Sequence, residues 1–184
     1  MAVTTLHLVR HGQSEWNLSR RLQGQVAHVP LTPLGLEQAR TAARALTGRP
    51  IAAVHSSDLL RARRTAEVIG VALGLPVQLD AELREQSYGV LEGLPSDEVL
   101  AAAPYDFTDP DARAPGGESL RDVHDRIGRR LAAYTERYAG EECVLVSHGD
   151  AIRIGLAALD GVGPGEVPWR ETPNGSITTV RLAR

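Results

Sequence analysis

Two histidine–glycine pairs end two similar apolar runs that lie far apart in the sequence. Residues 6–12 read LHLVRHG and residues 143–149 read CVLVSHG, and each run is typical of a buried parallel strand. In open α/β sheets, the groups just beyond the strand ends contact the ligand. If the two strands are neighbours, His11 and His148 share one crevice, and the adjacent Arg10 makes that crevice suitable for an anion.

Two further side chains, one cationic and one acidic, could complete such a site. Arg61 falls in the first turn of a predicted helix near this crevice, whereas Arg63 and Arg64 fit solvated positions. Glu85 lies in a loop with nearby glycines, from which a carboxyl group could pass a proton to a leaving group. Glu92 in the same loop is its main rival, although a role in holding the loop fits it better.

Strands and helices alternate along the chain, and this order predicts how the side chains are positioned. Alternation favours a mainly parallel sheet covered on both faces, that is, a three-layer α/β/α sandwich. Thr32 and Asp58 are predicted to cap two of the helices. We find no linker or low-complexity tract, so residues 1–184 are predicted to form one domain. The predicted strands are 3–9, 51–55, 76–79, 143–146 and 177–182, and the predicted helices are 33–47, 59–73, 96–103, 118–138 and 150–159.

The composition excludes several classes of function. A net charge of −3 argues against a general nucleic-acid binder, which needs a strongly basic face. No apolar run approaches the roughly 18–20 residues that span a bilayer, and no signal peptide is expected. Because Cys143 is the only cysteine, no disulfide framework exists, and a cytoplasmic location is predicted. All 20 basic residues are arginines, so guanidinium groups must hold any phosphate.

Five motif blocks follow one another across nearly the whole chain. They are RHG at 10–12 with Glu15 and Asn17, PLT at 30–32 followed by Gly35 and Gln38, SSDLLRARRTA at 56–66, the stretch from Glu85 to Gly93, and SHG at 147–149. In these motifs and their order, the sequence resembles the histidine phosphatase superfamily, also called the phosphoglycerate mutase-like family. The resemblance implies the fold of that family.

The resemblance also implies a role for each matching residue. His11 would take the phosphoryl group as a phosphohistidine, and Glu85 would protonate the leaving oxygen and then activate water. No metal or other cofactor would be required, because guanidinium and imidazolium groups supply the positive charge. The implied catalytic residues are His11, Glu85, Arg10, Arg61 and His148, and the implied substrate-binding residues are Arg10, Asn17, Gln23, Gly24, Arg61 and His148.

The residues after Glu85 favour a phosphatase over a mutase. Similar mutases carry an Arg-His pair there and a lysine in a longer insertion, whereas Gln86 and Ser87 follow here and the chain has no lysine. We therefore predict a phosphomonoester hydrolase for small phosphorylated metabolites. A phosphoglycerate mutase and a non-catalytic phosphate-binding protein are the alternatives. The dinuclear metal-ligand clusters of metallophosphoesterases and the G-x-S-x-G of serine hydrolases are missing.

The substrate and the oligomeric state stay open at this level. Selectivity is expected to come from Leu22, from the loop at residues 88–94 and from residues 101–115, which match the family poorly. A homodimer would be unsurprising for a chain of this size.

Overall fold

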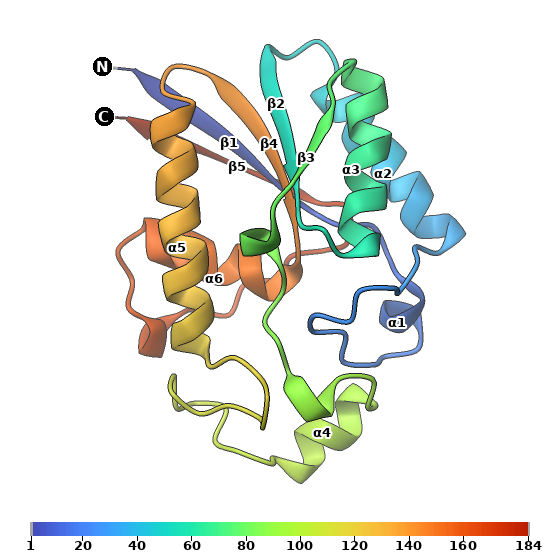
Figure 1. Ribbon diagram of the computed structural model, residues 1–184, viewed down its shortest axis with the longest axis vertical. Coiled ribbons are helices and arrows are strands. Elements are labelled where there is room, and N and C mark those ends of the chain that lie inside the picture. The colour runs from blue at the N-terminus through green and yellow to red at the C-terminus, as the bar shows by residue number, and fades with distance from the viewer. Residues whose placement is uncertain (1, 184) are drawn as a thin grey trace.

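The computed structural model describes residues 2–183, and a five-stranded sheet lies at its centre (Figure 1). The strand order is β3-β2-β4-β1-β5. The pairs β1–β4, β2–β4 and β2–β3 are parallel, and only the edge pair β1–β5 is antiparallel. The predicted mainly parallel sheet is therefore confirmed. The strands are β1 (Val3–Arg10), β2 (Ile51–Ser56), β3 (Val77–Leu79), β4 (Glu142–Ser147) and β5 (Ile177–Ala183).

Helices cover both faces of the sheet, which confirms the three-layer sandwich (Figure 1). Helices α2 (Pro33–Leu46) and α3 (Leu60–Leu73) pack on one face, and α5 (Leu120–Arg137) and α6 (Gly149–Leu159) pack on the other. Within residues 2–183, no helix is both long and apolar enough to cross a membrane. The connections hold α1 (Glu15–Leu18), α4 (Ser96–Ala102) and three 3₁₀ turns, η1 (Ala81–Leu83), η2 (Gly89–Leu91) and η3 (Pro164–Glu166).

The register between β1 and β4 brings the two histidine–glycine pairs together. Arg10 pairs with Ser147, so the residue that follows each strand is a histidine at the same sheet edge. The N–H of His11 donates to the carbonyl oxygen of Ser147 at 3.0 Å and extends the ladder by one bond. Along β4, Cys143 faces the α5–α6 side and Val144 faces the α2–α3 side, as expected for a strand buried on both faces.

One predicted helix cap is wrong, and the difference matters for the site. Thr32 caps α2 as predicted, but Leu59 occupies the N-cap of α3 without a side-chain bond. Asp58 instead binds the guanidinium of Arg84, with Arg84 Nε 2.7 Å from Asp58 Oδ1 and a second bond through Nη2. Two charge-assisted bonds to a guanidinium outweigh one cap bond to a neutral amide. The pair ties the start of α3 to the residue that precedes Glu85.

Two glycines allow the loop after β1 to pack against the start of α2. A Cβ on Gly12 would lie 2.1 Å from the carbonyl oxygen of Gly35, and one on Gly35 would lie 2.0 Å from that of Gln13. These separations are far below van der Waals contact, and both neighbours are backbone atoms that cannot rotate away. Gly12 is therefore needed for this backbone contact.

Replacing Gly35 with alanine is expected to lower the free energy of unfolding by about 1–3 kcal/mol, because the added methyl group overpacks a backbone contact. Urea denaturation measures this loss as a lower midpoint. Gly163→Ala is the matched control, since a Cβ there meets no atom within 4 Å. Equal midpoints for the Gly35→Ala and Gly163→Ala variants would contradict the packing argument.

Candidate active site

The rings of His11 and His148 lie against each other at the carboxyl edge of the sheet. Their centroids are 5.1 Å apart with the ring planes at 62°, and the two side chains are buried. The structure thus brings together the two histidines that the sequence places 137 positions apart (148 − 11). The shared location follows from the parallel pairing of β1 with β4.

The hydrogen bonding of His11 leaves one ring nitrogen available for nucleophilic attack. His11 Nδ1 lies 2.7 Å from the carbonyl oxygen of Gly12, which can only accept, so Nδ1 carries the proton. The lone pair then resides on Nε2. Burial, and next the charges of Arg61 and Arg10, lower the pKa of His11 well below its usual range. The ring is therefore neutral at physiological pH.

Arg10 and Arg61 supply positive charge, and neither forms an ion pair with a carboxylate of residues 2–183. Arg61 Nη1 donates to the carbonyl oxygen of Val26 at 2.9 Å and Nη2 donates to that of Gly24 at 2.7 Å. Arg10 Nη1 donates to the carbonyl oxygen of Thr172 at 2.5 Å. Burial lowers the pKa of Arg61 to about 10 and also lowers the pKa of Arg10. A guanidinium group stays protonated in proteins at neutral pH, so both groups are cations. Neutral carbonyl groups orient the two cations and leave their charge for a ligand.

Three buried polar atoms in this region have no hydrogen-bond partner within residues 2–183. They are Arg10 Nε, Arg61 Nε and His148 Nδ1. A buried polar atom left unpaired costs roughly 1–3 kcal/mol, so such atoms seldom gather without a reason. An anion with several oxygen atoms would pair them. The arrangement fits a phosphoryl group.

His148 differs from the charged clamp that the resemblance implies. Its Nε2 lies 2.8 Å from Ser57 Oγ, and burial, followed by the charge of Arg61, lowers the pKa of the ring well below its usual range. The strongest charged neighbours of His148 are cations, which disfavour an imidazolium. In the free protein, His148 is neutral, and the fixed positive charge comes from the arginines.

Glu85 sits at the N-terminus of α6, where its carboxylate accepts three backbone bonds. Glu85 Oε1 accepts from the N–H of Ala151 at 2.9 Å and from that of Gln86 at 3.1 Å, and Oε2 accepts from that of Asp150 at 3.2 Å. These bonds lower the pKa of Glu85, but burial and then the nearby carboxylate of Asp150 raise it above the usual value. A carboxyl group with a raised pKa can hold a proton for transfer near neutral pH.

Asn17, Gln23 and Gly24 are connected to the candidate site through different neighbours. Asn17 Oδ1 accepts from Asn174 Nδ2 at 3.2 Å, and the same Nδ2 lies 3.1 Å from the carbonyl oxygen of His11. Gln23 is linked to Asn17 through Ser14, whose Oγ lies 2.7 Å from Gln23 Oε1 and 3.0 Å from Asn17 Oδ1. Gly24 acts through its carbonyl oxygen, which orients the Arg61 side chain.

Four polar residues that support the site have no individual role in the sequence prediction. Asn174, for example, precedes Gly175 in a pair typical of a tight turn, and the structure places Asn174 Nδ2 3.1 Å from the carbonyl oxygen of His11. Thr65 Oγ1 accepts from the N–H of Gly12 at 3.0 Å and fixes the segment that follows His11. Their common signal is position near strand or helix ends at one sheet edge. The four residues are Ser57, Thr65, Thr172 and Asn174.

Glu92 and three further histidines, His7, His55 and His124, make contacts that hold the fold together. Glu92 Oε1 accepts from the N–H of Gln25 at 2.9 Å and from that of Tyr88 at 3.1 Å, so it holds two loops together as expected. His55 Nε2 lies 2.6 Å from Tyr138 Oη in the interior. His7 binds Glu142 and Thr179, and His124 binds the carbonyl group of Val162.

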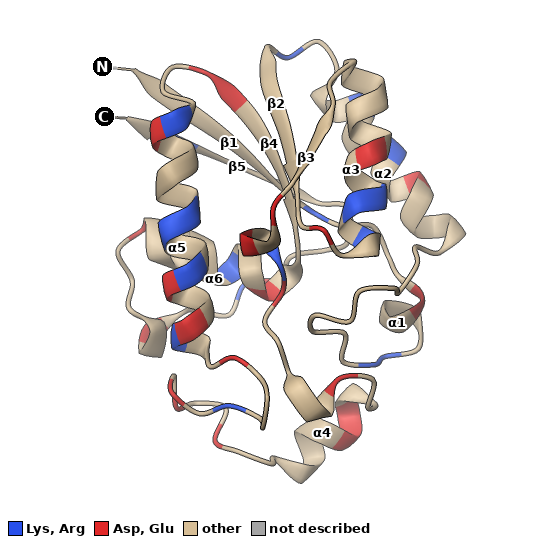
Figure 2. Ribbon diagram, viewed as in Figure 1, with Lys and Arg blue, Asp and Glu red and all other residues tan. Residues whose placement is uncertain are grey.

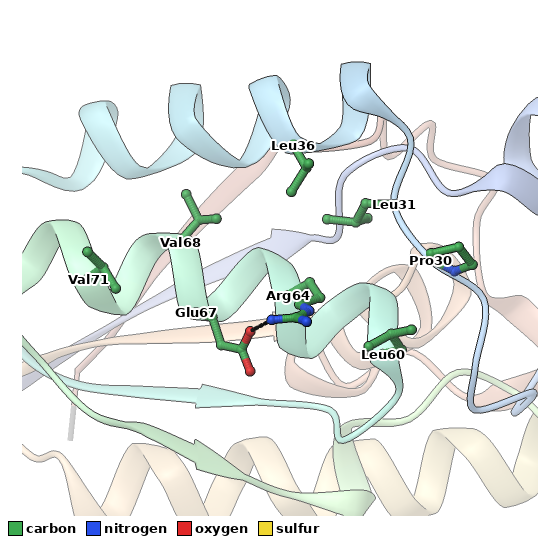
Figure 3. Close-up of a pocket in the computed structure, with 8 residues that line it drawn as sticks. All are labelled: Pro30, Leu31, Leu36, Leu60, Arg64, Glu67, Val68 and Val71. Atoms are coloured by element: carbon green, nitrogen blue, oxygen red, sulfur yellow. Dashed lines mark hydrogen bonds and ion pairs between the residues drawn. The ribbon is translucent and has the colours of Figure 1, made fainter.

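A cleft of about 170 Å³ opens beside Arg10 and Glu85, and we call it the phosphate cleft. A larger hollow of about 640 Å³ lies between α2 and α3 (Figure 3). Apolar side chains such as Leu36 and Val68 line that hollow, together with the Arg64–Glu67 ion pair. It contains none of the candidate catalytic residues. The phosphate cleft is lined by Arg10, Glu85, Gly149, Asp150, Arg153, Trp169, Arg170 and Thr172.

The fold and the site are together those of an α/β phosphatase. The sequence pattern of the histidine phosphatase superfamily (branch 1) matches residues 6–184, and the chain belongs to this family. The predicted family and the predicted phosphatase class of enzyme are thus confirmed.

Several known proteins similar to the chain carry phosphatase or mutase names. A probable phosphoglycerate mutase, GpmB, of Salmonella choleraesuis is 40% identical over 162 residues, which cover 85% of this chain and 75% of the relative. A mycobacterial glucosyl-3-phosphoglycerate phosphatase solved with VO3 has a TM-score of 0.86 and 34% identity, with 95% of this chain and 90% of that chain covered. A phosphoserine phosphatase of Entamoeba histolytica solved with 3-phosphoglyceric acid has a TM-score of 0.85 and 29% identity, with 96% and 89% covered.

Proposed function

We propose that the protein hydrolyses small phosphomonoesters through a phosphohistidine on His11. The observation that carries the proposal is the tautomer of His11. Its Nδ1 is committed to the carbonyl oxygen of Gly12, and its Nε2 lone pair is free beside Arg10 and Arg61. A neutral imidazole held in one tautomer beside two fixed cations is arranged for nucleophilic attack on a phosphoryl group.

In the first step, the lone pair of His11 Nε2 forms a bond to phosphorus and the ester P–O bond breaks. Glu85 gives its proton to the departing oxygen, so the alcohol leaves neutral and Glu85 becomes a carboxylate. Arg10 and Arg61 stabilise the charge on the equatorial oxygens during transfer. His148 adds a neutral hydrogen-bonding nitrogen, Nδ1, which otherwise lacks a partner within residues 2–183.

In the second step, water replaces the histidine. The Glu85 carboxylate takes a proton from water, the water oxygen bonds to phosphorus, and the P–N bond breaks. The products are inorganic phosphate and neutral His11, and Glu85 is protonated again for the next cycle. The sum of both steps is hydrolysis of one ester bond by one water molecule.

The proposed reaction needs no metal ion, because Arg10 and Arg61 already provide positive charge at the phosphoryl group. Among residues 2–183, no group of three or more His, Cys, Asp or Glu side chains is placed to hold a metal. The small volume of the phosphate cleft and the net charge of −3 favour a small phosphorylated molecule over a nucleic acid or membrane surface. Cys143 is buried and unpaired, which supports a cytoplasmic location.

A phosphoglycerate mutase is the second candidate, because similar curated proteins carry that name. A mutase must hold a second anionic group beyond the transferred phosphate. Gln86 follows the proposed acid, and its Nε2 donates to the carbonyl oxygen of Glu118 at 2.9 Å, so this side chain serves the fold. The structure therefore favours hydrolysis.

One assay separates these outcomes. The purified protein is incubated with a panel of phosphomonoesters that includes 3-phosphoglycerate, with and without EDTA, and both released phosphate and isomerised phosphoglycerate are measured. We expect phosphate release that EDTA does not reduce. Isomerisation without phosphate release would establish the mutase, loss of activity in EDTA would refute metal independence, and no turnover of any ester would refute the proposed function.

Burial is the largest cause of the raised pKa of Glu85, and the carboxylate of Asp150 adds to it, so Asp150 should shift the alkaline limit of the reaction. Asp150→Asn removes a negative charge that raises the pKa of Glu85, so that pKa should fall. Glu85 then loses its proton at lower pH, and the alkaline limb of the kcat–pH profile should move to lower pH. Asp160→Asn, at the far end of α6, should leave the profile in place. An unmoved alkaline limb in the Asp150→Asn variant would contradict this assignment.

A further inference from the structure

A second cleft of about 370 Å³ adjoins the phosphate cleft. The two clefts share Asp150 and Arg153, and the second is also lined by Gln86, the residue directly after Glu85. A group attached to a phosphate beside Glu85 could therefore extend into the second cleft. Under the proposed function, this group is the alcohol part of the substrate.

Aromatic and aliphatic side chains form much of the second cleft. The rings of Tyr105 and Phe107 contact each other, with centroids 4.5 Å apart and planes at 56°. Phe107 and Leu100 keep 44% and 64% of their surfaces exposed, so an apolar ligand that covers them would remove this surface from water. Both come from α4 and the loop after it. Further lining side chains are Tyr88, Leu120, Pro164 and Val167.

The polar groups of the second cleft offer little to an anionic ligand. Arg153 is the one cation among its lining residues, and its Nη2 and Nε donate to Asp150 Oδ1 at 3.0 and 3.2 Å. Tyr88 Oη donates to Asp150 Oδ2 at 2.8 Å. Asp109 adds another carboxylate to the wall. Figure 2 shows acidic residues predominating on α4 and the loop after it, but Asp97 and Asp111 are paired with arginines. A carboxylate-bearing alcohol would therefore meet repulsion from Asp109 in the wall of the cleft and no cation except the paired Arg153.

We propose that the second cleft binds the alcohol part of the substrate and selects uncharged apolar or aromatic alcohols over alcohols that carry a carboxylate. The substrate class is then a phosphomonoester with an apolar body, held by its phosphate at Arg10 and by its alcohol at Phe107. This inference rests on the proposed function, because it requires that Glu85 faces the leaving oxygen.

The test compares kcat/KM for three alkyl esters, so that aryl leaving-group reactivity does not intervene. They are phenethyl phosphate, ethyl phosphate and 3-phosphoglycerate. Wild type should prefer phenethyl phosphate over each of the others by at least about tenfold, since a buried aromatic ring contributes roughly that factor or more. Phe107→Ala should lower kcat/KM for phenethyl phosphate about tenfold more than for ethyl phosphate.

The ethyl ester serves as the internal control for folding of each variant. Val71→Ala removes an exposed apolar side chain far from the second cleft, in α3, and should preserve the wild-type preference. A wild-type preference for 3-phosphoglycerate, or an equal loss for all three esters in Phe107→Ala, would overturn the inference while the phosphatase function stands. No turnover of any ester would instead refute the proposed function itself.

Discussion

Replacing His11 with asparagine is expected to lower kcat/KM for phosphomonoester hydrolysis by at least about 10⁴-fold, because the variant has no nucleophile for the first step. Asparagine keeps a polar side chain of similar size, so the fold should persist. Arg10 and Arg61 should still bind phosphate in this variant, and KM should change far less than kcat. Steady-state phosphate release measures kcat, and inhibition by inorganic phosphate monitors the remaining binding.

His55→Gln provides the matched control for a buried histidine at a strand end. His55 lies near the end of β2 and contacts Tyr138, away from the proposed reaction. Its replacement should lower the free energy of unfolding by roughly 1 kcal/mol and leave kcat within a few-fold of wild type. If His11→Asn retained substantial activity, or if His55→Gln lost as much as His11→Asn, His11 could not be the nucleophile.

Replacing Glu85 with glutamine is expected to lower kcat for alkyl esters by about 10²–10⁴-fold, the usual contribution of general acid–base catalysis. The loss in the first step should be much smaller for p-nitrophenyl phosphate, because its leaving group departs without a proton. The second step still lacks its base, so phosphoenzyme should accumulate with this ester. Rapid-quench measurement of nitrophenol release should therefore show a burst that wild type lacks.

Glu92→Gln is the control for the rival carboxylate. Glu92 holds two loops together, so its replacement should reduce the activity toward alkyl and nitrophenyl esters by similar factors. If the loss of activity depended on the leaving group in Glu92→Gln and not in Glu85→Gln, the general acid would be Glu92 instead.

The sequence predicts the main residues of the candidate site because each of them follows from a short local pattern. The apolar runs before His11 and His148 indicate buried parallel strands, and the observed register places the two histidines at one edge. Arg61 is predicted as a site residue because it lies in the first turn of α3, the helix that follows β2. Glu85 follows from its loop and from the family resemblance, and the structure adds its position at the start of α6.

Other features depend on contacts between residues distant in sequence, and local reasoning cannot resolve them. Asp58 is a residue type that often caps helices, but it pairs with Arg84 instead, and only the fold determines that Arg84 lies beside it. The charge of His148 depends on burial and on the cations around it, which no local pattern reports. Asn174 contacts His11 only because the turn before β5 returns to the same edge.

For the region expected to determine selectivity, the sequence predicts the location but not the chemistry. Residues 101–115 match the family poorly, and this mismatch alone predicts that they distinguish substrates. The structure shows what these residues could bind, because Tyr105 and Phe107 lie next to each other in the second cleft, which shares Asp150 with the phosphate cleft. Ring contacts and shared walls arise from the path of the chain and have no signature in the sequence.

The central claim is that His11 carries the phosphoryl group during turnover, and trapping that intermediate tests it most directly. The protein is mixed with radiolabelled p-nitrophenyl phosphate, quenched in alkali, digested and analysed by mass spectrometry. We predict an alkali-stable, acid-labile phosphoryl group on the peptide that contains His11, in amounts increased by Glu85→Gln and absent from His11→Asn. A phosphoryl group on another residue, or turnover without any phosphoenzyme in the Glu85→Gln variant, would contradict the account.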